Sequence, residues 1–291
     1  MRVRLLRVAA VAIPVVALLV LFHYLAPGLR RARLTAELPA GYGVIREQPE
    51  YVVYGDRSSE TARHAAEVLG RFTEAVRGQF GELLKLAPPR IRCDVIVFRS
   101  HDDLSDYGRE RFDTDFDRNG GFYLPADRIL AVIGRRDFTG MMRALFHEGT
   151  HLMMDTWVKG TDHDWSLWLN EGLATWFEDS RFTARGVRLG GVQPESVEMM
   201  RRAIEAGKWV PVPRLLAATA GDFRGTENGL YYAQSGLLVD FLMQAEWRER
   251  LAAYLDAERR PGPVRPGTFE RRVEDPHTMD DRLRRYLARF P

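Results

Sequence analysis

The sequence predicts an α+β fold, because segments with strand patterns come early in the chain and segments with helical patterns come late. Two further observations support a single globular domain. The chain has 291 residues, of which 45% are hydrophobic and 28% charged, and it contains no internal repeat or low-complexity tract. A chain of this kind is expected to form one domain of about 250 residues with a substantial core.

The charge balance argues against a nucleic-acid partner. Lys and Arg total 42, Asp and Glu total 40, and acidic residues are interspersed with basic ones along the chain. No stripe of positive charge therefore marks a surface for phosphate groups. The one cysteine, Cys93, excludes an internal disulfide and a cysteine-based metal site, and we expect it to be a small core residue in a strand.

The first 34 residues predict a segment that targets the chain to a membrane. Residues 8–22 are apolar, and arginines flank them on both sides: Arg2, Arg4, Arg7, Arg30, Arg31 and Arg33. This is the pattern of an export signal, so a cleaved signal ending near Ala26 and Gly28 and an uncleaved anchor over residues 1–34 both stay open. We favour the anchor, at a bacterial cell membrane. The domain that follows is expected outside the cytoplasm, since large trailing domains are translocated largely regardless of charge.

The domain is expected over residues 44–291, after a linker near residues 38–43. Residues 51–54 have the sequence Tyr-Val-Val-Tyr, which predicts a short strand. Residues 58–86 carry apolar side chains at helical spacing, and the prolines that follow end that helix. Residues 91–98 form an alternating and mostly apolar run, which predicts a second strand.

The next segments predict a loop, a hairpin and a helix. The Asp-rich residues 101–121 predict a loop with one helical turn. Residues 122–124 and 129–133 flank a Pro-Ala-Asp turn and predict a β-hairpin. Thr139 is expected to cap a helix that continues to the end of an α/β lobe at residues 44–157.

Residues 158–291 predict a mainly helical lobe. A loop at residues 159–164 is expected to separate the preceding helix from a second one at residues 166–179. The aromatic residues of this second helix and its start are expected in the core: Trp165, Trp168, Trp176 and Phe177. Further helices are predicted at residues 195–206, 230–257 and 279–290, with Pro261-Gly262-Pro263 between the last two.

The helix that begins near Thr139 carries the sequence His147-Glu148-Gly149-Thr150-His151. Residues four apart project from one face of a helix, so the two imidazoles can converge on one ion with Glu148 beside them. Imidazole nitrogen suits zinc, which commonly takes three protein ligands and a water in catalytic sites. The motif therefore requires a third ligand.

Glu171 is the candidate for the third ligand, in the context Asn170-Glu171-Gly172 on the second helix. The intervening loop lets this helix fold back against the first, which would bring the carboxylate to the ion. His147, His151 and Glu171 therefore predict a zinc site with one open position. The alternative is a buried polar cluster that holds no metal.

Together these residues resemble the gluzincin zinc metallopeptidases, the clan that includes thermolysin, and most closely the bacterial peptidase MA-like proteins. The resemblance is sharpest over about residues 122–177 and fades outside them. It implies a zincin-like domain with a small mixed sheet, zinc ligation by His147, His151 and Glu171, and Glu148 as the general base. It also implies that the upstream hairpin offers an edge strand on which an extended substrate could pair.

The resemblance further implies a later Tyr or His that stabilises the oxyanion. Tyr231 and Tyr232 precede a segment similar to the family's next helix, and we favour Tyr232, with a packing role as the alternative. One feature departs from the pattern. Thermolysin-like enzymes often carry an acidic residue four positions after the glutamate ligand, but this chain has Thr175 there. Asp155 or Glu178 could orient a histidine instead, and the alternative for each is a solvated helix charge.

We therefore expect a zinc-dependent peptidase that acts on a peptide or protein outside the cytoplasm. Zinc makes a bound water acidic near neutral pH, and Glu148 would take the proton of that water and pass it to the leaving amine. Two alternatives stay open. One is a catalytically silent, membrane-anchored binding or assembly module, and the other is a zinc amidohydrolase that acts on a cell-envelope substrate.

Overall fold

The computed structural model describes residues 29–291, except residues 89–91, 115–119, 135–137, 159–164, 184–185 and 261–263. Three expectations fall outside the described residues: the apolar targeting segment at residues 1–28, the loop at residues 159–164 and the Pro-Gly-Pro break at residues 261–263. Within the described ranges, no helix combines the length and the apolar character needed to span a membrane. These ranges form a mixed α+β structure, as predicted.

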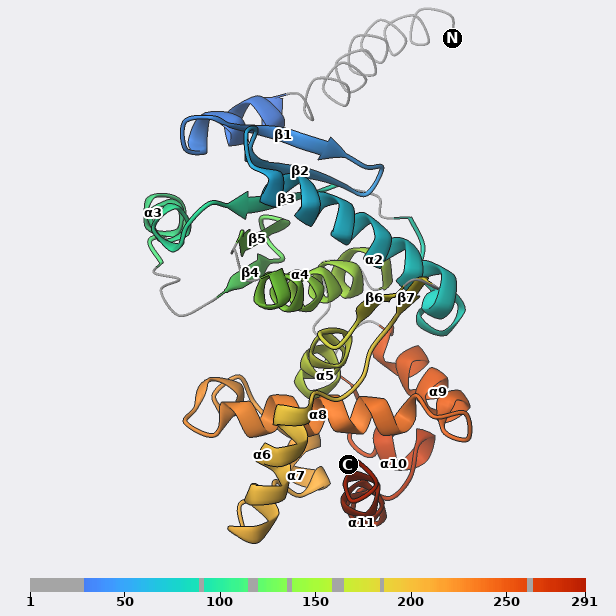
Figure 1. Cartoon of the computed structure of the whole chain (residues 1–291). Helices are drawn as coiled ribbons and strands as arrows, with labels where there is room; N and C mark the ends of the chain where they lie inside the picture. The colour runs from blue at the N-terminus through green and yellow to red at the C-terminus, as the bar shows by residue number, and fades with distance from the viewer. Residues whose placement is uncertain are drawn as a thin grey trace, which may run out of the picture.

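A five-stranded mixed sheet forms the first part of the fold (Figure 1). Its strands are β1 (Tyr42–Glu47), β2 (Tyr51–Asp56), β3 (Cys93–Phe98), β4 (Gly121–Leu124) and β5 (Ile129–Ile133). Their order in space is β1-β2-β3-β5-β4, with parallel pairs in the middle and an antiparallel pair at each margin. The predicted hairpin is confirmed as β4 and β5, and it places β4 at an edge of the sheet.

The central strand β3 is buried on both faces and separates two cores. Cys93 and Val97 face the core beneath α2 (Glu60–Leu84) and α4 (Phe138–Met153), whereas Ile96 faces the opposite core. Successive side chains of a strand point to opposite faces, so a strand covered on both faces needs a continuous apolar run. The expectation that Cys93 is a buried, unpaired core residue is confirmed.

Helices α2 and α4 cover one face of the sheet. The predicted helix at residues 58–86 is confirmed as α2, which begins after Ser59, whose side chain accepts a hydrogen bond from the amide of Ala62. Helix α4 begins at Phe138, so Thr139 lies inside its first turn, and the expectation that Thr139 is the N-cap is wrong. The chain then continues as a π-helical turn, Met154–Val158.

The segment after β3 was expected to be a loop with one turn, but residues His101–Phe112 form the twelve-residue helix α3. Two of the Asp residues that suggested a loop, Asp102 and Asp103, lie in its first turn, where carboxylates interact favourably with the positive end of the helix dipole. Ser100 caps the helix by accepting a hydrogen bond from the amide of Asp103 at 3.1 Å. Leu104 and Tyr107 are buried against the sheet face opposite α2.

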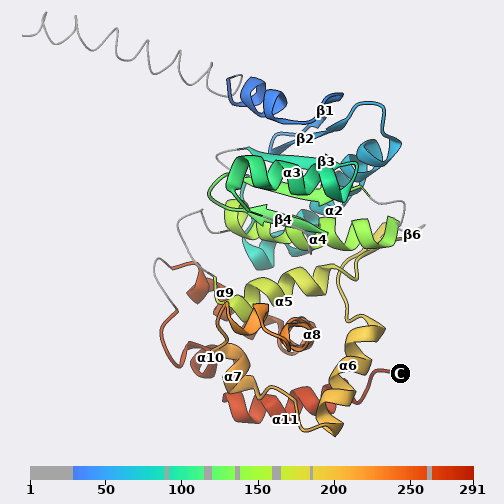
Figure 2. The ribbon, with the colours of Figure 1, turned by 90° about the vertical axis from the view of Figure 1, so that its left-hand side faces the viewer.

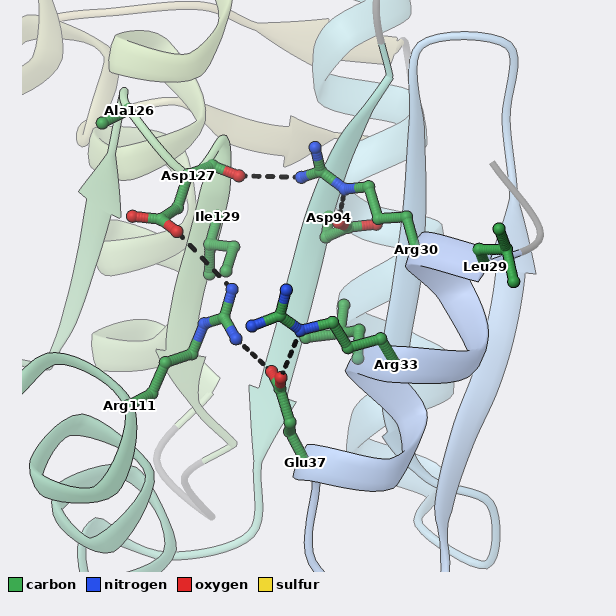
Figure 3. A pocket seen from close by; sticks show the side chains of 10 residues that line it. Leu29, Arg30, Arg33, Glu37, Asp94, Arg111, Ala126, Asp127 and Ile129 are labelled. Carbon is green, nitrogen blue, oxygen red and sulfur yellow. Dashed lines mark hydrogen bonds and ion pairs between the residues drawn. The ribbon is translucent and has the colours of Figure 1, made fainter. Parts of the chain in front are cut away.

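The residues before the sheet are also ordered, because β1 begins at Tyr42, inside the expected linker, and residues 29–37 are helical. Leu34 and Leu38 are buried in the core shared with α3. Arg30, expected in the basic flank of an anchor, donates to Asp94 Oδ2 at 2.8 Å and to the Asp127 carbonyl at 2.7 Å (Figure 3).

Further ion pairs hold the same helix against α3. Glu37 pairs with Arg33 on its own helix and with Arg111 of α3, and Arg111 also approaches Asp127 (Figure 3). The pocket between these elements is lined by three basic and three acidic side chains: Arg30, Arg33 and Arg111, and Glu37, Asp94 and Asp127. Its charges are therefore mutually compensated, and they attach residues 29–37 to the sheet.

The second part of the fold is mainly helical, as predicted, and packs beneath α4 (Figure 2). Helix α5 (Leu167–Phe177), predicted at residues 166–179, packs between α4 and α8 (Asn228–Leu242). The remaining elements are β6 (Arg181–Thr183), β7 (Gly186–Arg188), α6 (Pro194–Glu205), α7 (Val212–Leu216), the 3₁₀ turn η2 (Asp222–Arg224), α9 (Arg248–Glu258), α10 (Thr268–Arg272) and α11 (Pro276–Leu287).

The prediction of a single helix at residues 230–257 is wrong, because the chain forms two helices, α8 and α9, with a turn between them. The turn contains neither Gly nor Pro and so had no sequence signal. It is closed by packing, since Trp247 is buried and its ring lies 5.0 Å from the ring of Phe241. Helix α11 begins three residues before the expected start, where Asp275 accepts a hydrogen bond from the amide of Thr278 and Pro276 occupies the first turn.

Candidate metal centre

Helix α4 buries an apolar face and presents its polar motif to a cavity. Leu145 and Leu152 are buried in the core, whereas His147, Glu148 and His151 line the cavity. The centroids of the two imidazole rings lie 4.8 Å apart, as the four-residue spacing predicts. The sequence therefore places both imidazoles correctly on one face.

Glu171 on α5 completes the predicted triad. Its Oε2 atom lies 3.4 Å from Nε2 of His147 and 3.5 Å from Nε2 of His151. One ligand atom from each of the three residues lies within 4.8 Å of the others. The structure thus brings together side chains from two helices that sequence analysis joined by spacing alone.

A close contact between backbones fixes the position of Glu171. Gly172 packs against α8, and a Cβ atom at this position would lie 2.8 Å from the carbonyl oxygen of Ser235 and 3.0 Å from Val239 Cγ2. Only glycine permits so close an approach. The neighbouring carboxylate is therefore carried to the imidazoles by the packing of α5 on α8.

The arrangement of donor atoms fits a divalent cation. Oε2 of Glu171 is buried and has no hydrogen-bond partner among the described residues. The Nδ1 atoms of both imidazoles are already occupied, by Oε1 of Glu178 at 2.6 Å for His147 and by Oδ1 of Asn170 at 3.1 Å for His151. These acceptors favour the tautomer with the proton on Nδ1, which leaves both Nε2 lone pairs free beside Oε2. Two imidazole nitrogens and a carboxylate oxygen are a ligand set that suits zinc.

The acid that orients His147 is Glu178, seven positions after Glu171. Its second oxygen accepts a hydrogen bond from Nε2 of Gln193 at 2.9 Å, so the carboxylate is held at both ends. Asp155, the other candidate, instead accepts a hydrogen bond from the hydroxyl of Tyr123 at 2.7 Å. The departure at Thr175 is therefore compensated from the next turn of the chain.

The charges at the site perturb one another strongly. Burial opposes the charged form of His147 and His151, but the close carboxylates outweigh it and raise the pKa of both imidazoles. The same contacts lower the pKa of Glu171, although burial acts in the opposite direction. Burial raises the pKa of Glu148. The carboxylates around the two imidazoles favour bound protons there. For the same electrostatic reason they favour a bound cation.

The triad opens into a cavity of about 670 Å³. Strand β4, turn η2 and Tyr232 of α8 line it together with the motif on α4. Gly121 lets the edge strand pass close to the catalytic candidate, since a Cβ there would lie 3.4 Å from Glu148 Cγ and 2.7 Å from the Ala131 carbonyl. The cavity is thus bounded by the proposed ligands and by the exposed edge of the sheet.

Of the two candidate tyrosines, Tyr232 lies at the site. It lines the cavity, and its ring centroid is 6.1 Å from that of His147. Burial, reinforced by Glu171 and Glu148, raises the pKa of Tyr232, so its hydroxyl keeps its proton. Tyr231 turns away and donates to Asp222 at 3.2 Å.

The aromatic residues near α5 divide between core and cavity. Trp168, Trp176 and Phe177 are buried in the core, as predicted. Trp165 is also buried, but it additionally lines the cavity.

Sequence analysis missed one residue, far along the chain, that hydrogen-bonds to the start of α5. The buried carboxylate of Glu258 accepts hydrogen bonds from the amide of Ser166 at 3.1 Å and from its hydroxyl at 2.6 Å. It therefore satisfies the start of the helix that carries Glu171. No local pattern connects residues that lie this far apart in the chain.

A family model matches part of the chain. The model of the family DUF1570, described as a protein of unknown function, matches residues 142–264. The matched segment contains His147, Glu148, His151, Glu171 and Tyr232. Among curated proteins, none matches the chain.

Proposed function

We propose that this protein is a zinc-dependent metallopeptidase of the gluzincin type, related to the peptidase MA-like proteins. The observation that carries the proposal is the convergence of Nε2 of His147, Nε2 of His151 and the unpartnered Oε2 of Glu171. The adjacent Glu148 and the open cavity support hydrolysis over a purely structural metal site, since structural sites are closed by a fourth protein ligand.

When bound, zinc would acidify a water molecule and polarise the carbonyl of the substrate. Glu148 lies beside the triad and would accept the proton of the attacking water and then deliver it to the leaving amine. Its burial raises its pKa, which suits a carboxylate that must release and hold a proton in turn. The protonated hydroxyl of Tyr232 would donate a hydrogen bond to the developing oxyanion.

The residues around the ligands would keep the imidazoles in place. Glu178 and Asn170 accept from the Nδ1 atoms of His147 and His151, which fixes the tautomer and the orientation of both rings. Strand β4 pairs only with β5 among the described strands, so its outer edge can pair with an extended peptide. A peptide laid along that edge would cross the cavity beside Glu148.

The decisive experiment compares metal content and hydrolysis in matched variants. Purified wild-type protein should contain about one zinc per chain and should cleave members of a broad peptide mixture in a chelator-sensitive manner. Glu148→Gln should keep the zinc and lose hydrolysis, and His147→Ala should lose both. Zinc bound without cleavage of any peptide would contradict the proposal.

Two alternatives are distinguished by the same experiment. The silent binding module was suggested by Thr175 and by the unassigned oxyanion donor. The contact of Glu178 with His147 answers the first of these reasons, and a loss of chelator-sensitive hydrolysis in Glu148→Gln would exclude the module. An amidohydrolase for cell-envelope material would use the same residues, so cleavage of such material and not of peptides would favour it. From the pattern of residues 1–34, we also propose that the domain acts outside the cytoplasm, on a membrane anchor or after its release.

A further inference from the structure

The cavity contains a basic side chain that the proposed chemistry does not use. Among the described residues that line the cavity, Arg224 is the one arginine or lysine. The acidic groups there are engaged: Glu171 faces the imidazoles, Glu148 stands beside them and Asp155 accepts from Tyr123. The question is therefore what Arg224 would bind.

The backbone that carries Arg224 is held firmly against the site. Phe223 is buried, and its ring lies 5.1 Å from that of Tyr232 and 5.6 Å from that of Tyr231. Asp222 accepts hydrogen bonds from the amide of Thr219 at 2.8 Å and from the hydroxyl of Tyr231. These contacts fix turn η2 beside Tyr232, and Arg224 lines the cavity from this turn.

The guanidinium of Arg224 has no acidic partner within ion-pair distance among the described residues, whereas the nearby Arg214 approaches Asp222 at 3.9 Å. The charge of Arg224 partly opposes the rise in the pKa of Tyr232, which places it within electrostatic reach of that hydroxyl. The side chain is solvent-exposed at the cavity, so binding a partner would not require it to leave a buried pair.

We propose that Arg224 determines specificity by binding a carboxylate of the substrate, an inference that rests on the proposed peptidase function. The planar guanidinium offers parallel N–H donors that match the two oxygens of a carboxylate. On a peptide this carboxylate is either an acidic side chain near the scissile bond or the carboxyl terminus. Arg224 would then bind the carboxylate of a peptide whose backbone pairs with the edge strand, since both line the same cavity.

The test measures peptide binding to full-length Glu148→Gln protein loaded with zinc, because this variant should bind without turnover. Three labelled short peptides serve as probes. One is neutral and amidated, the second carries Glu in place of one Gln, and the third is neutral with a free carboxyl terminus. We expect the second or the third to bind about five to ten times more tightly than the first, and the peptide that does so identifies the source of the carboxylate.

Variants at Arg224 then assign the preference. Arg224→Gln should abolish it and leave the neutral peptide unaffected, and Arg224→Lys should retain part of it because the charge remains without the paired donors. Arg272→Gln is the matched control, since it removes an exposed charge that does not line the cavity, and it should keep the full preference. Unfolding curves verify that each variant is folded.

Equal binding of all three peptides, no binding of any of them, or a preference that survives Arg224→Gln would overturn the inference. Hydrolysis assays use protein that keeps Glu148, with and without the Arg224 substitutions. They distinguish failure of the inference about Arg224 from failure of the proposed peptidase function. Cleavage without a carboxylate preference would leave the peptidase standing and reject the role of Arg224. Peptide binding that depends on Arg224, without cleavage of any peptide, would support the role of Arg224 in binding and reject the peptidase function.

Discussion

At the scale of single residues, the site depends on how each carboxylate is engaged. Glu171 has a buried oxygen between two imidazoles, Glu178 holds His147 from behind, and Asp155 is bound by Tyr123. Glu148 is partly buried and lines the cavity with the triad. In the proposed function, the carboxylates would thus serve as ligand, orienting group and base according to their surroundings.

The orienting role of Glu178 can be tested by removing its charge. Glu178→Gln should weaken zinc binding by about ten- to a hundredfold, because the amide no longer fixes and polarises the His147 ring. Affinity is measured by competition with a chromogenic chelator. Asp155→Asn removes the same charge from a group bonded to Tyr123, and it should weaken binding far less. Equal losses in the two variants would contradict this assignment.

The titration of the imidazoles predicts opposite effects of pH with and without metal. In the metal-free protein the raised pKa of His147 and His151 contributes stability that is fully present below the unfolded value of 6.5 and is lost as pH rises through the folded pKa. Zinc competes with these protons, so its stabilising effect should grow over the same range. Thermal unfolding is measured with zinc and with a chelator.

We expect the melting temperature of the chelated protein to fall as pH increases above neutrality. The increment added by zinc should rise over the same interval. His147→Gln should flatten both trends, since it removes the group with the strongly raised pKa. A chelated protein that becomes more stable as pH rises through this range would show that the carboxylates do not hold protons on the imidazoles.

At the scale of secondary-structure elements, the site is made by the contacts of α5. Its start is satisfied by Glu258 of α9, its middle packs on α8 at Gly172, and its end leads to Glu178. The triad therefore depends on helices that supply no ligand. Packing of α5 against both neighbours sets the distance from Glu171 to the imidazoles.

Substitution at Gly172 tests this dependence. Gly172→Ala would place a methyl group 2.8 Å from the Ser235 carbonyl, so α5 and α8 must separate, at a cost of about 1 to 3 kcal/mol in the free energy of unfolding. Zinc affinity should fall with it. Gly78→Ala on α2 is the control, because its Cβ would meet nothing within 4 Å and should stabilise the helix by about 0.5 to 1 kcal/mol. Urea unfolding and chelator competition measure the two effects, and equal stability of the variants would contradict the packing argument.

At the scale of the whole molecule, the sheet has a core on each face, and the two helices that carry the triad, α4 and α5, bury their apolar side chains in only one of them. The other core is closed by α3 and by the helix at residues 29–37. That helix is the described part of the chain nearest the predicted targeting segment. Its contacts with α3, β3 and the β4–β5 turn attach this helix to the domain.

Removing Arg30 should loosen this attachment. Arg30→Ala leaves the buried carboxylate of Asp94 without its 2.8 Å partner, and we expect the free energy of unfolding to fall by about 1 to 3 kcal/mol. Arg33→Ala is the matched control, since its side chain is 76% exposed and pairs within its own helix, and it should change stability little. Urea unfolding measures both variants. Zinc affinity should be unchanged in each, and a coupled loss of zinc would show that the far core also shapes the site.

The sequence by itself determined the local features of this protein. The four-residue spacing places His147 and His151 on one helical face, and the apolar run in β3 marks a strand covered on both sides. It also indicated the β4–β5 hairpin and the helices that carry the site. These features follow from backbone periodicity over a few residues, which each segment satisfies by itself.

Only the tertiary structure decided which distant groups meet. It placed the Glu171 carboxylate against the imidazoles, selected Glu178 over Asp155 as the orienting acid and brought Arg224 to the cavity that the edge strand also lines. It also divided α8 from α9 at a turn with no Gly or Pro. The physical reason is that such contacts depend on how whole elements pack and on what each packing arrangement buries. No pattern within a single segment encodes the distance between side chains that belong to different helices.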